Sequence, residues 1–218
     1  MDTFYSQYEQ DKFIYDSLFK IESSGRFSNR HNSGFFVDIG AYDGKALSNT
    51  LHFENLGWKG LCFEPIPDVF KKLVENRPGA ECHQCVIGHQ ERESTTFLQV
   101  TGPAEMLSGV LDYYDSAHMF RINKETFESG GEQNGIDVEM HTLDHFLLPG
   151  TEIDYLSLDT EGGEPIILEN ILKNFTPKVI SVEANYQAEA QRILEFTKEK
   201  YDLVKQLGCD MILVIKQQ

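Results

Sequence analysis

The sequence has no long hydrophobic run and few basic residues. No stretch of its 218 residues approaches the ~20 consecutive apolar residues of a membrane-spanning helix, so we expect no membrane partner. The opening MDTFYSQYEQDKF is polar and acidic, unlike a secretory signal, which predicts a cytoplasmic protein. With 19 Lys and Arg against 35 Asp and Glu, the formal net charge is −16. Such a charge argues against nucleic acid as the main partner, because the phosphate backbone would be repelled.

Cysteine is also scarce, and its four residues do not suggest a disulfide framework. Cys82 and Cys85 have C-x-x-C spacing, but no second C-x-x-C and no H-x-x-x-H completes a zinc site. They fall in AECHQCVIG, which is typical of a strand, where residues three apart point to opposite faces. We therefore expect buried thiols. There are no internal repeats, and the length suits one α/β domain over 1–218, either a whole protein or one domain of a longer enzyme.

Residues 35–65 carry the strongest pattern. They predict, in order, a buried strand (35–39), a glycine turn (40–44), a helix (45–55) and a second buried strand (60–63). Glu64 follows the second strand, about 20 residues beyond the turn. Ligands of open parallel sheets bind at the carboxyl ends of the strands, and a carboxylate there suits the hydroxyls of a ribose. This unit therefore predicts a nucleoside-cofactor site.

The glycine turn indicates which nucleoside is bound. A dinucleotide fingerprint needs a middle glycine that lets the backbone meet a pyrophosphate, and Ala41-Tyr42 stands there instead. Asp38 would face a pyrophosphate badly but suits a cationic cofactor such as S-adenosylmethionine. The pattern D-I-G-A-x-x-G resembles the first motif of class I S-adenosylmethionine-dependent methyltransferases. An NAD(P)-dependent oxidoreductase and a non-catalytic nucleoside-binding module stay open as alternatives.

The rest of the chain continues the alternation of helices and strands. An N-terminal helix and loop (1–33) has Ser6 as a possible cap, and its polar residues 6–11 either start a solvated helix or fold over the cofactor. The irregular, glycine-rich segment 101–135 is the candidate acceptor-binding lid. The remaining predicted elements are helices at 67–76, 166–174 and 188–200, strands at 80–88, 95–100, 138–142, 153–159 and 178–182, and a hairpin of 203–207 with 211–216.

The order of the motifs resembles the FkbM family of methyltransferases. VDIGAYDG is followed by FEP, by H-T-L-D (141–144), by IDYLSLDTEGGE and by SVEAN. The opening S-Q-x-x-Q-D (6–11) and the run 48–50 resemble one branch of that family. The resemblance covers nearly the whole chain. It implies a Rossmann-like class I methyltransferase: an α/β fold with a seven-stranded, mostly parallel sheet, an antiparallel last strand and helices on both faces.

The same resemblance implies a donor and a class of acceptor. The donor is S-adenosyl-L-methionine, and the acceptor is a hydroxyl of a sugar, a glycan or a similar small molecule, so the implied activity is O-methyl transfer. Glu64 matches the ribose ligand, and Asp159 falls at the strand end that faces the transferred methyl group. The other implied cofactor contacts are Asp38, Gly40, Ala41, Gly44, Ser48, Pro65, Cys85 and Val86.

Removal of the hydroxyl proton requires a base, for which we consider Asp159, Glu161, Glu183 and His141. A structural role is the alternative for His141, and the one we favour. Asp159 and Glu183 end neighbouring predicted strands, so their carboxylates should converge. An alternative role for Glu161 and Glu164 is to stabilise the N-terminus of the next helix, where the helix dipole favours anions. Asp159, Glu183 and Asn185 resemble the ligands of metal-dependent O-methyltransferases and would hold Mg²⁺ or Mn²⁺. Paired carboxylates at strand ends also serve as plain hydrogen-bond acceptors.

Overall fold

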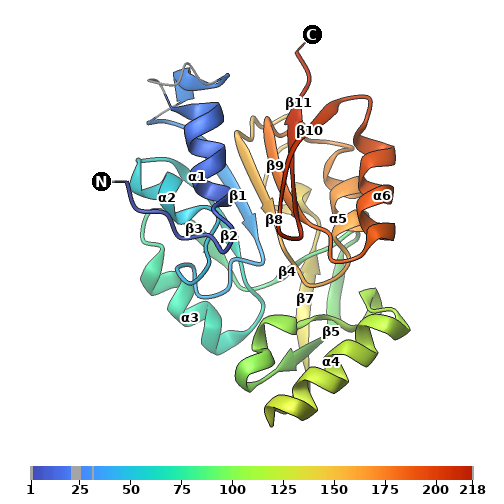
Figure 1. Ribbon diagram of the computed structural model, residues 1–218. Helices are drawn as coiled ribbons and strands as arrows, with labels where there is room; N and C mark the ends of the chain where they lie inside the picture. Colours follow the sequence, from blue (N-terminus) through green and yellow to red (C-terminus); the bar gives the residue numbers. More distant parts are fainter. Residues whose placement is uncertain (1, 21–25, 31, 218) are drawn as a thin grey trace.

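The computed structural model describes residues 2–20, 26–30 and 32–217, and its centre is a seven-stranded sheet (Figure 1). The strands follow the order β10 (Tyr201–Leu207), β11 (Asp210–Ile215), β9 (Val179–Glu183), β8 (Tyr155–Leu158), β1 (Phe35–Ile39), β2 (Lys59–Phe63) and β3 (Glu81–His83). All neighbours are parallel except β11, which runs antiparallel to both β9 and β10. The predicted seven-stranded sheet with an antiparallel last strand is confirmed.

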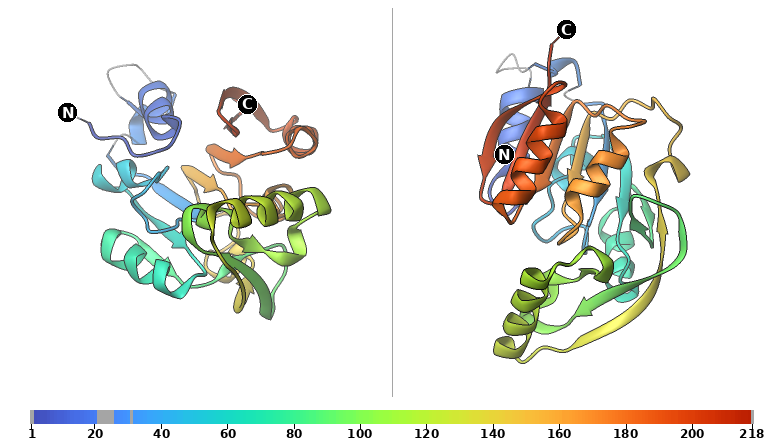
Figure 2. Two further views of the ribbon diagram at one scale, coloured as in Figure 1. Left: turned by 60° about the horizontal axis from the view of Figure 1, so that its bottom comes forward. Right: turned by 90° about the vertical axis from the view of Figure 1, so that its right-hand side faces the viewer.

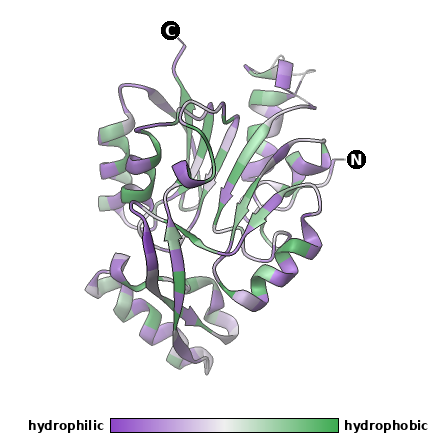
Figure 3. Cartoon of the chain, turned by 180° about the vertical axis from the view of Figure 1, so that it is seen from behind, coloured by the Kyte–Doolittle hydropathy of each residue, from purple (hydrophilic) through white to green (hydrophobic). Residues whose placement is uncertain are grey.

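Alternate residues of the central strands pack on opposite faces of this sheet. Val37 and Leu156 pack against helices α5 (Glu164–Ile171) and α6 (Gln187–Thr197). Phe36 and Tyr155, one position away, belong to a second core with α1 (Gln10–Ile14), α2 (Leu51–Asn55) and α3 (Pro67–Asn76). This period of two is the geometry of a strand covered on both faces. Figure 3 shows the resulting hydrophobic strands between helices, so the predicted α/β class is confirmed.

Two predicted helices begin later than expected. The helix expected at 45–55 forms only from Leu51, because Asp43 Oδ1 accepts the backbone N–H groups of Lys45 and Ala46 and holds that stretch as a turn. The N-terminal helix begins at Gln10 and continues as a π-helical turn over Tyr15–Phe19. Ser6 is not its N-cap residue, because that position is Glu9. The Ser6 hydroxyl donates to Asp11 Oδ1 over 2.5 Å and accepts the backbone N–H of Asp11 over 3.2 Å. Local side-chain hydrogen bonds thus replaced the predicted helical turns.

A second, four-stranded sheet lies beyond the carboxyl ends of the main strands (Figures 1 and 2). Its order is β4 (Val86–Ile87), β7 (Gln133–His141), β5 (Arg92–Val100) and β6 (Gly109–Val110). The single strand predicted over 80–88 is therefore wrong, since the chain leaves β3 at His83 and enters the other sheet at Val86. The strand predicted at 95–100 belongs to this sheet and runs antiparallel to β7.

The segment 101–135 is more regular than predicted. It contains two short 3-10 turns and the 14-residue helix α4 (Ser116–Ser129). Asp115 caps that helix by accepting the backbone N–H of His118, and Gly130 ends it with φ of 71°. Among the described residues, no helix is long and apolar enough to span a bilayer.

Candidate functional site

The strand register places four predicted site residues at one edge of the main sheet. Ile39 lies opposite Phe63 in β2 and Leu158 in β8, and Leu158 lies opposite Val182 in β9. The residues that follow these paired positions are Gly40, Glu64, Asp159 and Glu183. Because the four strands are parallel, these residues stand side by side at the carboxyl edge, where ligands of such sheets bind.

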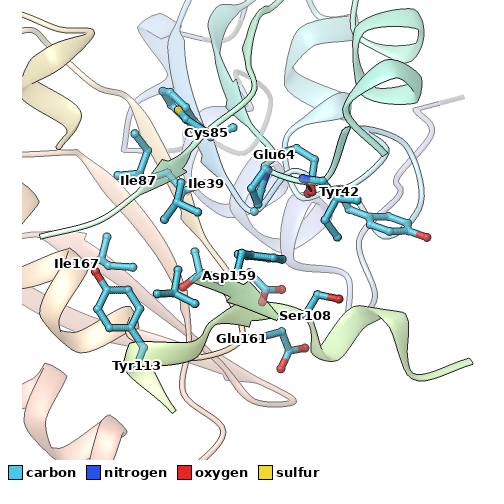
Figure 4. A pocket seen from close by; sticks show the side chains of 18 of the residues that line it. Ile39, Tyr42, Glu64, Cys85, Ile87, Ser108, Tyr113, Asp159, Glu161 and Ile167 are labelled. Atoms are coloured by element: carbon cyan, nitrogen blue, oxygen red, sulfur yellow. Dashed lines mark hydrogen bonds between the residues drawn. The ribbon is translucent and has the colours of Figure 1, made fainter. Parts of the chain in front are cut away.

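An apolar hollow opens at this edge (Figure 4). Ile39, Cys85 and Ile87 lie at one end of it, and Tyr42 and Glu161 lie at the other. The predicted cofactor residues that line it are Gly40, Glu64, Pro65, Cys85, Val86 and Asp159. Residues of the small sheet, including Phe97 and Val110, form its far wall.

Glu64 is the buried carboxylate of the apolar hollow, with 5% of its surface exposed. Its Oε1 accepts the backbone N–H of Ile66 over 2.8 Å, and the carboxylate also accepts the N–H of Tyr42. Burial raises the pKa of Glu64 to about 7, against the opposing effect of these two hydrogen bonds. The side chain is therefore fixed in position and titrates near neutral pH.

Gly40 and Gly44 have structural reasons for lacking a side chain. A Cβ on Gly40, whose φ is +87°, would lie 1.7 Å from the carbonyl oxygen of Asp159. Gly40 thus lets the turn after β1 meet the end of β8. A Cβ on Gly44 would meet the side chains of Arg77 and Leu73 at 2.5 and 2.6 Å, and Gly44 lines neither hollow described here.

Asp38 belongs to a buried ionic network around Arg77. The Arg77 guanidinium, with no exposed side-chain surface, donates to Glu54 Oε2 over 2.5 Å and to Thr50 Oγ1 over 2.9 Å. Its Nη1 lies 3.6 Å from Asp38 Oδ2, and the Thr50 hydroxyl donates to Asp38. Burial raises the pKa of Asp38, and Arg77 opposes that rise. This engagement explains how Asp38 supports the turn, while its contact with a cofactor stays a prediction.

A second, polar hollow adjoins the first and shares Gly40, Tyr42, Met106, Asp159 and Glu161 with it. The other predicted site residues that border it are Asp38, Ala41, Ser48, Glu183 and Asn185. Tyr42 and Glu161, with φ of 50° and 55°, adopt the left-handed conformation. Non-glycine residues adopt it at a cost in free energy, and such strain gathers at functional sites.

Carboxylates dominate this polar hollow. One oxygen each from Asp159, Glu161 and Glu183 lie within 4.8 Å of one another. Burial and then the charge of Asp159 raise the pKa of Glu161 to about 9, and burial and then Glu161 raise that of Glu183 to about 9. Neither Glu161 Oε2 nor Glu183 Oε2 has a hydrogen-bond partner within the described part of the chain. Asp210, at the start of β11, adds another buried carboxylate.

The sequence left two roles open for Glu161: a base in the cleft, or a residue that stabilises the next helix. Of the two glutamates assigned to the helix N-terminus, Glu164 has that role, since its carboxylate accepts the N–H groups of Thr160 and Gly162. Glu161 instead points to the cleft that Asp159 and Glu183 border. Its place in LDTEGGE could not reveal this, because the direction of its side chain depends on the left-handed backbone at that position.

The N-terminal segment 7–10 borders the cleft, and His141 does not. Gln7, Tyr8 and Gln10 line the polar hollow, and the Gln10 amide donates to Asp210, so the N-terminal segment lies along the cleft. His141 lines neither hollow; it lies on β7, with Nδ1 2.8 Å from Glu91 Oε2. The structure thus brings Asp159 and Glu183 together without His141.

The chain is similar in fold to several solved methyltransferase structures. No curated protein matches the chain. A candidate rRNA methylase from Clostridium thermocellum shares 11% identity at a TM-score of 0.49, over 100% of this chain and 99% of that one. A TehB-like SAM-dependent methyltransferase from Corynebacterium glutamicum shares 10% at 0.45, over 97% and 89%. Fibrillarin from Aeropyrum pernix, in complex with natively bound S-adenosyl-L-methionine, shares 12% at 0.41, over 83% and 65%.

The family itself comes from a sequence profile. The profile described as the methyltransferase FkbM domain matches residues 38–208, from near the end of β1 to the turn between β10 and β11. The match spans most of the chain and contains Glu64, Asp159, Glu161 and Glu183. The chain therefore belongs to the FkbM methyltransferase family.

Proposed function

We propose that this methyltransferase transfers the methyl group of S-adenosyl-L-methionine to a hydroxyl of a sugar, a glycan or a similar small hydroxylated acceptor. The observation that carries the proposal is the pair of hollows at the carboxyl edge of the sheet. One is apolar and contains Glu64, the other is polar, and Asp159 borders both. Donor and acceptor would meet where the two hollows join. A cytoplasmic location and an acceptor other than nucleic acid or membrane are part of the same proposal.

The residues of the apolar hollow fit the donor. Phe63, Ile66 and Val86 supply apolar surface for an adenine ring, and Glu64 can accept hydrogen bonds from both ribose hydroxyls. A sulfonium and an ammonium group bound beside Asp159 and Glu161 would lower the raised pKa values of these two groups and be stabilised by the carboxylates that form. Those carboxylates would repel the pyrophosphate of a nicotinamide dinucleotide, which speaks against the oxidoreductase alternative. When bound, the donor supplies a methyl group on a positively charged sulfur.

The lining of the polar hollow supports a hydroxyl-bearing acceptor. Gln7, Asn49 and Asn185 offer amide donors and acceptors, and Tyr8 offers an aromatic ring with a hydroxyl. Pro103 and Arg121, both from the predicted lid 101–135, border the same hollow. We therefore retain this segment as the acceptor-binding part of the proposal.

Positioning and proton removal are the two tasks that the chain would perform. Methyl transfer is an in-line displacement, so holding the acceptor oxygen opposite the leaving sulfur contributes much of the rate. A base that takes the hydroxyl proton contributes ~10²–10⁴-fold. Asp159 borders both hollows and Glu183 borders the polar one, which makes these two carboxylates the candidates for the base. His141 lies outside both hollows.

The proposal includes a divalent cation at the carboxylates. Asp159 and Glu183 are retained as ligands, and Glu161 is added because one oxygen from each of the three residues lies within 4.8 Å of the others. Asn185 borders the same hollow. Oxygen ligands of this kind suit Mg²⁺ or Mn²⁺, which would orient a hydroxyl and lower its pKa. We expect calorimetric Mn²⁺ binding that weakens at least tenfold in Glu161→Gln, as for a lost ligand group. Glu195→Gln, an exposed carboxylate on α6, should leave it unchanged; equal affinity in both variants would remove the cation from the proposal.

Donor affinity should depend on pH through Glu64. Its pKa of about 7 in the free protein means that a proton must leave before the carboxylate accepts both ribose hydroxyls. Binding favours the charged form, so affinity for S-adenosylhomocysteine should be highest above pH 7 and fall by up to about tenfold per pH unit below it. Titrations between pH 5.5 and 8 check this. Glu64→Gln should reduce the slope below pH 7 and leave the part of the pH dependence that comes from Glu161, whose pKa is also raised.

The acceptor class is tested by product detection. The protein is incubated with S-adenosylmethionine and a panel of monosaccharides, glycans, amines and thiols, and S-adenosylhomocysteine is measured. We expect release with hydroxylated acceptors and a product one methylene unit heavier. Turnover only with amines or thiols would overturn the hydroxyl assignment, and donor binding without turnover on any acceptor would favour the non-catalytic module.

A further inference from the structure

His141 forms part of a side-chain cluster outside the cleft. Its Nδ1 lies 2.8 Å from Glu91 Oε2, and His145 Nδ1 lies 3.7 Å from the same oxygen. The two imidazole rings are 4.1 Å apart between centroids. The three residues come from three segments: the turn before β5, the end of β7 and the 3-10 turn Leu143–His145. One ligand atom from each lies within 4.8 Å of the others.

These distances suit a small tetrahedral ion. With metal–ligand bonds of 2.0–2.1 Å, the ligand atoms of a tetrahedral zinc site stand about 3.3 Å apart. The separations of 2.8 and 3.7 Å bracket this value, so small side-chain shifts would open the site. His145 has half of its side chain exposed, which leaves a path for entry and room for a water as the fourth ligand.

Two of the three residues, His141 and Glu91, are already held in place by neighbouring side chains or backbone groups. The other ring nitrogen of His141, Nε2, lies 3.3 Å from Glu139 Oε2, the carboxylate–histidine pairing that orients imidazoles toward metals. Glu91 Oε1 accepts the N–H and the hydroxyl of Thr142, over 2.7 and 2.8 Å. Its Oε2 therefore stays directed at the two imidazoles. Arg92, the cation nearest in sequence, is engaged by Asp112 at 2.6 Å.

We propose that Glu91, His141 and His145 form a binding site for a Zn²⁺-type transition-metal ion, separate from the methyl-transfer cleft. Two imidazoles and one carboxylate favour Zn²⁺, Co²⁺ or Ni²⁺ over Mg²⁺ and Ca²⁺, which prefer sites made of oxygen. The ion cross-links the turn before β5 to the end of β7 and to the turn that leads toward β8. It thereby fastens the small sheet that walls the apolar hollow, without contact with the reacting groups.

Calorimetry with ZnCl₂ on the chelator-stripped full chain tests this site, with Mg²⁺ in excess to occupy the carboxylates of the cleft. We expect one Zn²⁺ site per chain, with affinity at least tenfold lower in His145→Ala and in Glu91→Gln. Zn²⁺ should raise the melting temperature of the wild type and leave that of His145→Ala unchanged. Co²⁺ should give a visible absorption band that His145→Ala loses.

Matched variants separate this site from others. Glu93→Gln makes the same charge change in the same surface hollow without removing a ligand, so it should bind Zn²⁺ like the wild type. Glu161→Gln, in the cleft, should also leave Zn²⁺ affinity unchanged. No Zn²⁺ binding by the wild type, or equal affinity in the wild type, His145→Ala and Glu91→Gln, would overturn the proposal.

Discussion

Replacing Glu183 with Gln is expected to lower turnover by about 10²–10⁴-fold, the range for loss of a general base. Glu183 has 8% of its surface exposed, borders the polar hollow and keeps Oε2 free of hydrogen bonds to the described residues. The pKa of Glu183 is raised in the free protein, and a cation bound beside it would lower that pKa and leave the carboxylate free to act as a base. Gln preserves the shape of the side chain but can neither take a proton nor neutralise a cation. The rate of S-adenosylhomocysteine formation with a sugar acceptor measures the effect.

Donor affinity distinguishes this loss from a general disturbance of the cleft. Glu183 does not line the apolar hollow, so Glu183→Gln should bind S-adenosylhomocysteine like the wild type. Glu195→Gln makes the same charge change on exposed α6 and should keep full turnover. A Glu183→Gln protein with unchanged turnover would leave Asp159 as the candidate base.

Replacing Arg77 with Met is expected to destabilise the protein by about 3–5 kcal/mol, as for a broken buried ion pair. The substitution keeps most of the side-chain volume but leaves Asp38 and Glu54 near each other in the interior without their cation. It also removes the hydrogen bond to Thr50. Urea unfolding followed by circular dichroism measures the change in free energy of unfolding.

Two variants test whether the buried charges cause that loss. Arg192 pairs with Glu169 at 3.1 Å with about half of each side chain exposed, so Arg192→Met should cost no more than about 1 kcal/mol. Adding Asp38→Asn and Glu54→Gln to Arg77→Met should restore part of the stability, because no unpaired charge then remains. Equal losses in Arg77→Met and Arg192→Met would contradict the network described here.

The core of the fold was predictable because its signals are local. The apolar run 35–39, the glycine turn 40–44 and the acid after 60–63 follow from residue type and spacing, and the structure contains each as predicted. The end of β3 at His83 was not predictable, because the residues on both sides of it within 80–88 favour strands. Only tertiary pairing sends β3 to β2 and β4 to β7. In 101–135 the glycines suggested a loop, although Asp115 and Gly130 are the two ends of a helix.

The sequence predicted which edge of the sheet carries the candidate site, but it did not predict which side chains contact one another there. Parallel pairing of the strands places Glu64, Asp159 and Glu183 at one edge of the sheet, regardless of how their side chains are oriented. The ion pair of Asp38 could not be predicted, for example, because its partner Arg77 is 39 positions further along the chain. His141 is a second case: a histidine near the end of a strand was a reasonable base, but that strand belongs to the other sheet.

Calorimetric titration of S-adenosylhomocysteine into the wild type and Glu64→Gln tests the central claim most directly. We expect binding by the wild type that weakens by about 10–100-fold in the variant, as for hydrogen bonds to a buried charged group. Glu81→Gln, an exposed carboxylate on the neighbouring β3, should bind like the wild type. No binding by the wild type, or equal affinity in wild type and Glu64→Gln, would contradict the assignment of this cleft to the methyl donor.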